Sequence, residues 1–267
     1  MDTHFQQDWA LSCPSCLISA QMEREYVEMA LLHYQSALTA SKRASDYLIH
    51  ERGLSASIIS EFNVGFCDRS FGRLLPEGES IEGAMARGAL QRQGIIKPNG
   101  REALRGCITF PVRGPDGQLI DVYGRKIAKY QRRGSAHRMT LFKERCSFFN
   151  AQVLNSETKI VLVSSPLEAL SLIQLGVTNT VGLLGLNTLS EMMLTQLAKS
   201  MVHQVTVIFA AHAAGQRYSN LVCKQLTELG IAAQSYFPEA NGDINNMLTT
   251  SSAIRELVSH AVKAKSV

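Results

Sequence analysis

The sequence contains no apolar run that approaches the roughly 18 residues a transmembrane helix needs. Its first residues, MDTHFQQDW, also lack the basic and then apolar pattern of a secretory signal. No internal repeat and no low-complexity tract stands out in its 267 residues, 45% of which are hydrophobic. We therefore expect a cytoplasmic protein that folds as one large domain or two small ones and has no membrane partner.

The cysteines are scattered, and their placement does not suit a zinc site. Of six cysteines, only Cys13 and Cys16 form a CxxC pair, which His4 precedes. A structural zinc ion takes four ligands, usually from two such pairs, and the sequence has no second pair. We therefore expect no Zn²⁺ at Cys13 and Cys16, and reduced thiols rather than disulfides elsewhere.

Positive charge is unevenly distributed along the chain. The formal net charge is only +4, yet the segment Arg101–Arg145 holds eleven Lys and Arg against four Asp and Glu. Aromatic residues such as Tyr130 and Phe142 lie among these cations, so the segment could attract phosphates and stack on bases. A solvated basic loop with its aromatic rings in the core is the alternative.

The C-terminal part predicts an α/β sheet. Three short apolar runs are each followed by residues at helical spacing, and they lie at Ile160–Val163, Thr180–Leu184 and Val205–Phe209. Buried parallel strands have this pattern, and chemistry in such sheets sits just past the carboxyl ends of the strands. Here those ends carry Ser164 and Ser165, Gly185, and Ala210 to His212.

The N-terminal part predicts mixed helices and strands. A long helical stretch, 23–52, is expected to break near Ala40, and the turn residues 114–117 predict a β-hairpin. The other expected elements are short helices at Ala56–Phe62, Ile81–Gln91 and Ala253–Lys263, and strands at Val64–Phe66, Cys107–Val112 and Leu119–Tyr123.

Six motifs in this order resemble the catalytic core of bacterial-type (DnaG-like) primases. They are YLIHERGLSASIISEFNVGF, GCITFPVRGPDGQLIDVYGRKI, LFKERCSFFN, IVLVSSPLEALSLIQLGVTNTVGLLG, IFAAHAAGQR and FPEANGDINNML. The resemblance implies an α+β subdomain at 23–156 and a Rossmann-like Toprim domain with a mainly parallel sheet at 157–250. An irregular tail, 1–22, and a C-terminal helix, 251–267, are expected to flank them.

The family's Toprim site uses carboxylates to hold divalent metals, usually Mg²⁺, for phosphoryl transfer. At the matching positions this sequence has Ser164 and Ser165 in place of the first Glu-Gly, and Ala210 and His212 in place of Asp-x-Asp. The resemblance retains Glu168 and Asp243 as acids, while Asn245 replaces the last one. Because single groups of a catalytic unit commonly matter by orders of magnitude, we expect no RNA synthesis by the family's mechanism.

The basic residues are candidates for a nucleic-acid-binding track. The resemblance places Arg105, Arg125 and Lys143 at or near positions that face the template groove, although an Arg–carboxylate pair could explain any one of them. The full set of candidates is Arg105, Arg125, Lys126, Lys129, Arg132, Arg133 and Lys143.

The sequence favours a catalytically inactive, primase-like accessory factor that binds single-stranded or structured nucleic acid. It would act with replication, transfer or recombination proteins, conceivably on a mobile element, and would need no cofactor. One alternative is an active primase or nuclease that uses Mg²⁺ or Mn²⁺, or a softer metal, at Glu168, Asp243 and His212. Another is a protein-interaction module that docks a partner in its Toprim cleft.

Overall fold

The computed structural model describes residues 19–128, 138–141, 147–186, 188–237 and 245. Its contacts divide the chain into two compact units. The N-terminal unit takes residues 1–45, 62–110 and 122–143, and the C-terminal unit takes 46–61, 111–121 and 144–267. The domain bounds expected from the sequence stay a prediction. The CxxC pair and the expected C-terminal helix lie outside the described residues.

The long helical stretch of the N-terminal part breaks where the sequence predicts. Helix α2 (Ala20–Ala40) begins at Ser19, whose side chain accepts a hydrogen bond from the Met22 N–H, and ends at Ser41. Helix α3 (Lys42–Asp46) and a π-helical turn, η2 (Tyr47–Glu51), follow. The predicted break is confirmed, whereas the π-turn has no sequence signal. Helices α4 (Ala56–Glu61) and α5 (Ile81–Arg92) are the two expected short ones.

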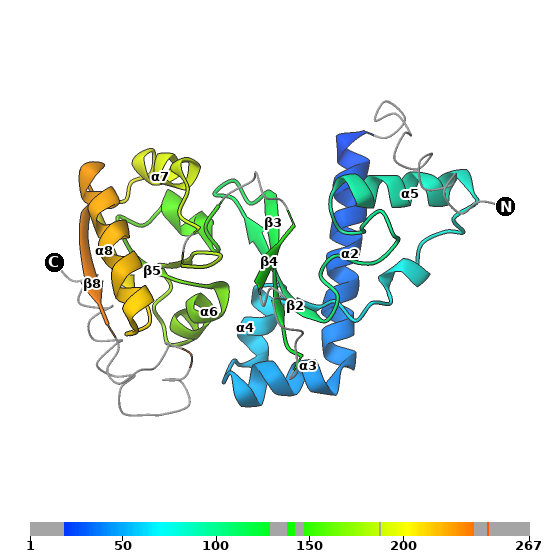
Figure 1. Ribbon diagram of the computed structural model, residues 1–267, viewed down its shortest axis with the longest axis horizontal. Helices are drawn as coiled ribbons and strands as arrows, with labels where there is room; N and C mark the ends of the chain where they lie inside the picture. The colour runs from blue at the N-terminus through cyan, green and yellow to red at the C-terminus, as the bar shows by residue number, and fades with distance from the viewer. Residues whose placement is uncertain (1–18, 129–137, 142–146, 187, 238–244, 246–267) are drawn as a thin grey trace. The chain divides into compact units, whose positions relative to one another are not determined.

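A four-stranded sheet follows the order β1-β2-β3-β4 (Figure 1). Its strands are β1 (Gly65–Phe66), β2 (Cys107–Arg113), β3 (Leu119–Lys126) and β4 (Arg138–Thr140). The predicted hairpin between β2 and β3 is confirmed, and the Gly114 N–H donates to the Gln118 carbonyl at 2.9 Å. Gly117 has a φ of 79°, a conformation that favours glycine in such a turn.

The C-terminal unit contains the predicted parallel sheet, in the order β6-β5-β7-β8. Its strands are β5 (Lys159–Val163), β6 (Thr180–Gly182), β7 (Gln204–Ile208) and β8 (Ala232–Tyr236). Its helices are α6 (Pro166–Gln174), α7 (Glu191–Ala198) and α8 (Ala213–Glu228). The expected α/β fold is confirmed; strand β8 is an addition to it.

A hydrophobic cluster covers one face of the parallel sheet. Alternate residues of β5 and β7, such as Leu162 and Val207, pack against Leu197 of α7 and Leu226 of α8. Helix α6 contacts β5 and β6 and is itself almost wholly buried, but it contributes no residue to this cluster. Among the described residues, no helix combines the length and the apolar character needed to cross a membrane.

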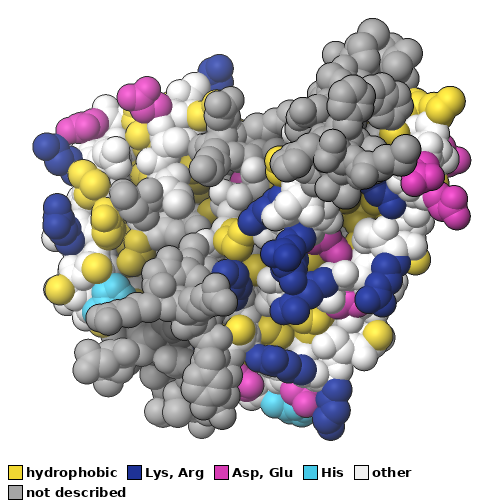
Figure 2. Space-filling model, turned by 45° about the vertical axis from the view of Figure 1, so that its right-hand side comes forward, with side chains coloured by type: hydrophobic (Ala, Val, Ile, Leu, Met, Phe, Trp, Pro, Cys, Tyr) yellow, Lys and Arg dark blue, Asp and Glu magenta, His cyan; other side chains and the backbone are white. Residues whose placement is uncertain are grey.

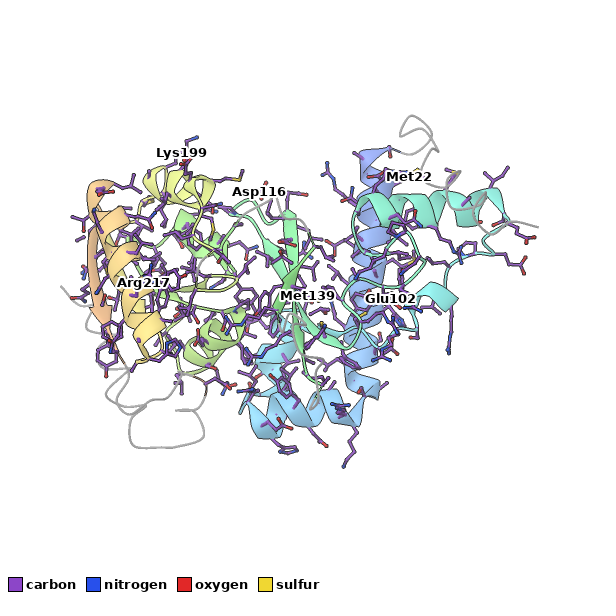
Figure 3. All side chains as sticks on the ribbon, in the orientation of Figure 1. Met22, Glu102, Asp116, Met139, Lys199 and Arg217 are labelled. Atoms are coloured by element: carbon purple, nitrogen blue, oxygen red, sulfur yellow. The ribbon has the colours of Figure 1, made fainter. Side chains whose placement is uncertain are left out.

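The N-terminal unit buries a carboxyl group beside α2. Glu102, labelled in Figure 3, is 5% exposed and accepts hydrogen bonds from the Tyr34 hydroxyl at 2.9 Å and the Cys67 thiol at 3.1 Å. Burial raises the pKa of both Tyr34 and Cys67, and the charge of Glu102 adds to each rise. Both groups therefore stay protonated and donate to the carboxyl oxygen.

Candidate functional site

The first site position follows β5, where Ser164 and Ser165 precede α6. Ser165 is the N-cap of α6, and Pro166 occupies the first helical position, as the SPLE sequence favours. Glu168, in the first turn, is only 6% exposed. Its Oε2 accepts hydrogen bonds from the Ser164 N–H at 3.0 Å, the Ser164 hydroxyl at 2.5 Å and the Ser165 hydroxyl at 3.3 Å.

These bonds engage one of the two carboxylate oxygens of Glu168 in the turn itself. A metal ligand must direct a lone pair at the ion, whereas three donors already point their hydrogens at Oε2. The negative charge also lies in the first turn of α6, where the helix dipole favours it. The retained acid thus stabilises the strand-to-helix turn on which it sits.

The second position follows β7, where His212 is the N-cap of α8. Its Nδ1 accepts a hydrogen bond from the Gly215 N–H at 2.9 Å. An accepting Nδ1 implies that Nε2 carries the proton in the neutral ring, so neither nitrogen offers a free lone pair. Ala210, two residues earlier, is half-buried and has no polar side-chain atom.

Gly215 brings α8 close to the end of β7. A Cβ at this position would lie 2.0 Å from the Ala210 carbonyl oxygen. Only glycine permits this approach. The backbone at the end of β7 is therefore held close to α8, although Ala210 and His212 replace the acids that the primase motifs have there.

Asn245, the third position, is 1% exposed and fully engaged. Its side-chain amide donates to the Arg52 carbonyl at 2.8 Å and the Ser171 hydroxyl at 3.1 Å, and its oxygen accepts from Arg52 Nη1 at 3.2 Å. The Arg52 guanidinium also lies 5.0 Å from the centre of the Tyr47 ring. Asn245 therefore ties residues of the η2 region to α6.

The donor set of these positions does not fit a hard divalent cation. Mg²⁺ needs several oxygen ligands, and of the described positions only Glu168 offers a carboxylate. Within the described ranges, no group of three or more His, Cys, Asp and Glu residues could hold a metal ion. Asp243, the other retained acid, lies outside these ranges.

The predicted basic residues lie in the N-terminal unit, and two of them point to opposite sides of its sheet. Arg125 and Lys126 are consecutive in β3, so their side chains face opposite directions. Arg125 pairs in register with Arg138 of β4, the strand marked by Met139 in Figure 3. Arg105 is half-buried and precedes the left-handed Gly106. Four candidates lie outside the described residues: Lys129, Arg132, Arg133 and Lys143.

Two arginines of this arrangement were not predicted from the sequence. Arg138 is exposed opposite Arg125, and only the register of β3 and β4 reveals the pair. Arg52 belongs to the ERGLS motif, but its bonds to Asn245 connect residues 193 apart in the chain. A local sequence pattern cannot predict a contact of that range.

Two family models match the chain, one after the other. The model described as DNA primase catalytic core, N-terminal domain, matches residues 33–154, and the model described as Toprim-like matches residues 161–248. The DNA primase of Haemophilus influenzae is 28% identical over 202 residues, which are 72% of this chain and 33% of the relative. The chain thus spans about a third of that curated protein.

Solved structures share the fold at low sequence identity. The RNA polymerase domain of Mycobacterium tuberculosis primase matches with a TM-score of 0.72 and 16% identity, over 92% of this chain and 87% of that one. A DnaG primase catalytic domain bound to single-stranded DNA matches with a TM-score of 0.69 and 16% identity, over 91% and 78%. The described fold is therefore that of the DnaG catalytic core.

Proposed function

The chain carries a DNA primase catalytic-core N-terminal domain followed by a Toprim-like domain, and we propose that it binds nucleic acid without metal-dependent catalysis. It would act as an accessory factor in replication, transfer or recombination in the cytoplasm. A setting on a mobile element belongs to the same proposal.

The hydrogen bonding of Glu168 carries the catalytic part of this proposal. Phosphoryl transfer by two divalent ions needs several carboxylates that can clamp the attacking and leaving oxygens. Here two serines donate to Oε2 of Glu168, and His212 caps a helix with Nδ1. A cation held through Oε2 or Nδ1 would have to displace these bonds.

The cross-strand pair of Arg125 and Arg138 supports nucleic-acid binding. Like charges directly opposite each other in an antiparallel pair destabilise the sheet. A phosphate near both guanidinium groups would accept charge-assisted hydrogen bonds from them. One structural relative is described as bound to single-stranded DNA and another as complexed with double-stranded DNA, which favours the same class of ligand.

The test is binding of a fluorescent single-stranded oligonucleotide across a salt series, with and without Mg²⁺ and Mn²⁺. Affinity should fall steeply with salt, with a slope of about −0.7 per phosphate contact on a logarithmic plot. It should not require either metal once ionic strength is matched. Arg138→Gln should weaken binding and flatten the slope, whereas Lys224→Gln, an exposed change of equal charge on α8, should do neither.

Other outcomes would contradict the proposal in distinct ways. A metal requirement, together with nucleotide incorporation or strand cleavage, would indicate the active-enzyme alternative with a site built on Glu168, Asp243 and His212. Absence of binding under all conditions would favour the protein-interaction alternative. In either case the accessory nucleic-acid-binding role would be wrong.

A further inference from the structure

A second group of cations gathers around Gly106 in the N-terminal unit. Arg43 of α3 donates from Nη2 to the Ile127 carbonyl at 3.0 Å, and the Ile127 N–H donates to the Gly106 carbonyl at 3.4 Å. Nη2 of Arg69 lies 3.5 Å from the point where a Cβ on Gly106 would stand. Two segments far apart in the chain thus bring cationic side chains to one stretch of backbone.

Lys126 adds a third charge beside the same backbone. A Cβ on Gly124, two residues earlier in β3, would lie 3.3 Å from the Cys107 Cβ, so Lys126 points to the side of β3 that faces Cys107. Burial raises the pKa of the Cys107 thiol to about 11, and the positive charge of Lys126 opposes that rise. Lys126 directly precedes Ile127 in the chain. We call Arg43, Arg69 and Lys126 the Gly106 cluster.

Arg69 adopts a backbone conformation that its side chain disfavours. Its φ is 78°, and such a conformation costs a non-glycine residue about 1–3 kcal/mol. The loop is held by hydrogen bonds from the Ser70 N–H and hydroxyl to Asp68, and by His33, which contacts the Ser70 hydroxyl at 2.8 Å. Strain that the surrounding structure maintains in this way clusters at ligand-binding sites.

The cations of the cluster have no acidic partner in the part of the chain that the structure describes: the ion pairs there involve none of Arg43, Arg69 and Lys126. Asp68, next to Arg69 in the chain, directs its carboxylate at Ser70 and His33 instead. Arg43 and Arg69 are exposed and Lys126 is half-buried. Figure 2 shows one face of the molecule on which Lys and Arg side chains, in dark blue, gather.

This arrangement suits a phosphate group. Guanidinium groups donate in a planar fork that matches phosphate oxygens, and an ammonium adds a point charge. Gly106, with φ of 71° and no side chain, leaves space beside the cations, while its own N–H donates to the Cys67 carbonyl at 2.8 Å. An anion there would be contacted by cationic side chains from three separate segments of the chain.

We propose that the Gly106 cluster binds a phosphate of the nucleic-acid backbone, as a second contact separate from Arg125 and Arg138. Lys126 and Arg125 point to opposite sides of β3, so the two contacts lie on different faces of the sheet. The proposal rests on the nucleic-acid-binding function above and names a further site for it. Free nucleoside triphosphate is the other source of the same phosphate chemistry.

The test uses Arg69→Gly and Lys126→Gln, each assayed for binding of the oligonucleotide and of a fluorescent ATP analogue. Arg69→Gly removes the guanidinium and the strain together, so it should raise the thermal unfolding midpoint while it weakens binding. Each variant should weaken oligonucleotide binding severalfold and lower the salt slope by about 0.7. Arg24→Gln, an exposed arginine of α2, is the control with equal loss of charge.

The outcomes separate this site from the function on which it rests. Weaker oligonucleotide binding with unchanged ATP binding supports the backbone contact, and the reverse overturns it in favour of a nucleotide site. If the wild-type chain binds the oligonucleotide and both variants match Arg24→Gln, the Gly106 cluster is not a binding site, while the proposed function stands. If the wild-type chain binds neither ligand, both proposals fail.

Discussion

At the scale of single residues, Glu168 is the clearest case of an acid that serves its own fold. The primase motifs have an acid at the position of Glu168, but they cannot predict which hydrogen-bond donors reach its carboxylate oxygens. That depends on Ser164 and Ser165, which stand where the primase motifs have Glu and Gly and which place two hydroxyls within hydrogen-bond distance. The position was predictable from the sequence, whereas its hydrogen bonding was not.

Glu168→Gln should therefore destabilise the C-terminal unit. The amide would bring an N–H₂ group to a pocket already filled with donors and would lose charge-assisted hydrogen bonds, at a cost of about 1–3 kcal/mol. Urea unfolding followed by circular dichroism measures the change. Oligonucleotide affinity should stay at the wild-type value.

A matched control is Glu191→Gln, which removes an exposed acid from the first turn of α7. Its effect should stay within about 0.5 kcal/mol, as is usual for surface positions. Equal stability of the two variants would show that the bonds to Glu168 contribute little. A Mg²⁺-dependent stability of the wild-type chain that Glu168→Gln abolishes would identify Glu168 as a ligand.

At the scale of elements, the sequence predicts buried strands better than exposed ones. Strands β5 and β7 are apolar, β-branched and almost fully covered, so their pattern is unambiguous. Strand β8 has the sequence AAQSY and lies at the sheet edge with three of its residues exposed, so it carries no such pattern. It forms because β7 offers it a row of backbone partners, which only the assembled sheet supplies.

The junction between β7 and α8 yields a prediction for Gly215. A methyl group in Gly215→Ala would meet the Ala210 carbonyl oxygen, so the helix must shift away from the strand end. We expect a loss of about 3 kcal/mol or more, the upper range for overpacking, measured by thermal unfolding. Gly72→Ala is the control, because a Cβ there meets nothing within 4 Å.

That control should be neutral or stabilise the chain by up to about 1 kcal/mol, since alanine restricts the unfolded state. A Gly215→Ala variant as stable as Gly72→Ala would mean that α8 can move without cost. The close approach of helix and strand would then not be a fixed part of the strand-end geometry.

At the scale of the whole molecule, buried thiols report on the two units separately. Cys67 and Cys107 are fully buried in the N-terminal unit, and burial raises the pKa of both, to about 11 for Cys107. Cys223, in the C-terminal unit, is half-buried on α8. The thiolate is the reactive form, so the burial of Cys67 and Cys107 and their raised pKa values both lower the reactivity of these thiols.

We expect iodoacetamide at pH 8 to label Cys223 in the native chain, and Cys67 and Cys107 only when urea unfolds the N-terminal unit. Raising the pH to about 9 should leave Cys107 protected, because its pKa of about 11 stays above that value. Peptide mass spectrometry resolves the sites. Labelling of Cys67 or Cys107 at the rate of Cys223 in the native chain would contradict the burial of this core.

The last prediction couples metal binding to the stability of the molecule. Ala210→Asp with His212→Asp would add two carboxylates at the strand ends near Glu168, and the aspartate introduced by His212→Asp can still cap α8 through the Gly215 N–H. Without metal, the added acids should repel one another and lower the unfolding midpoint. Mn²⁺ should restore the free energy of unfolding, by about 2.7 kcal/mol at a hundredfold excess over the dissociation constant, and so raise the midpoint again. The unfolding midpoint of the wild-type chain should not respond to Mn²⁺.

The matched control places two aspartates at the opposite end of the sheet, where β7 and β8 begin. His203 and Ala232 are exposed neighbours there, joined by the Ala232 N–H and the His203 carbonyl at 2.9 Å. His203→Asp with Ala232→Asp adds equal charge away from Glu168, so Mn²⁺ should not raise its midpoint. A response of the wild-type chain, or equal responses of the two double variants, would contradict the prediction that acids at positions 210 and 212 complete a metal site at this strand end.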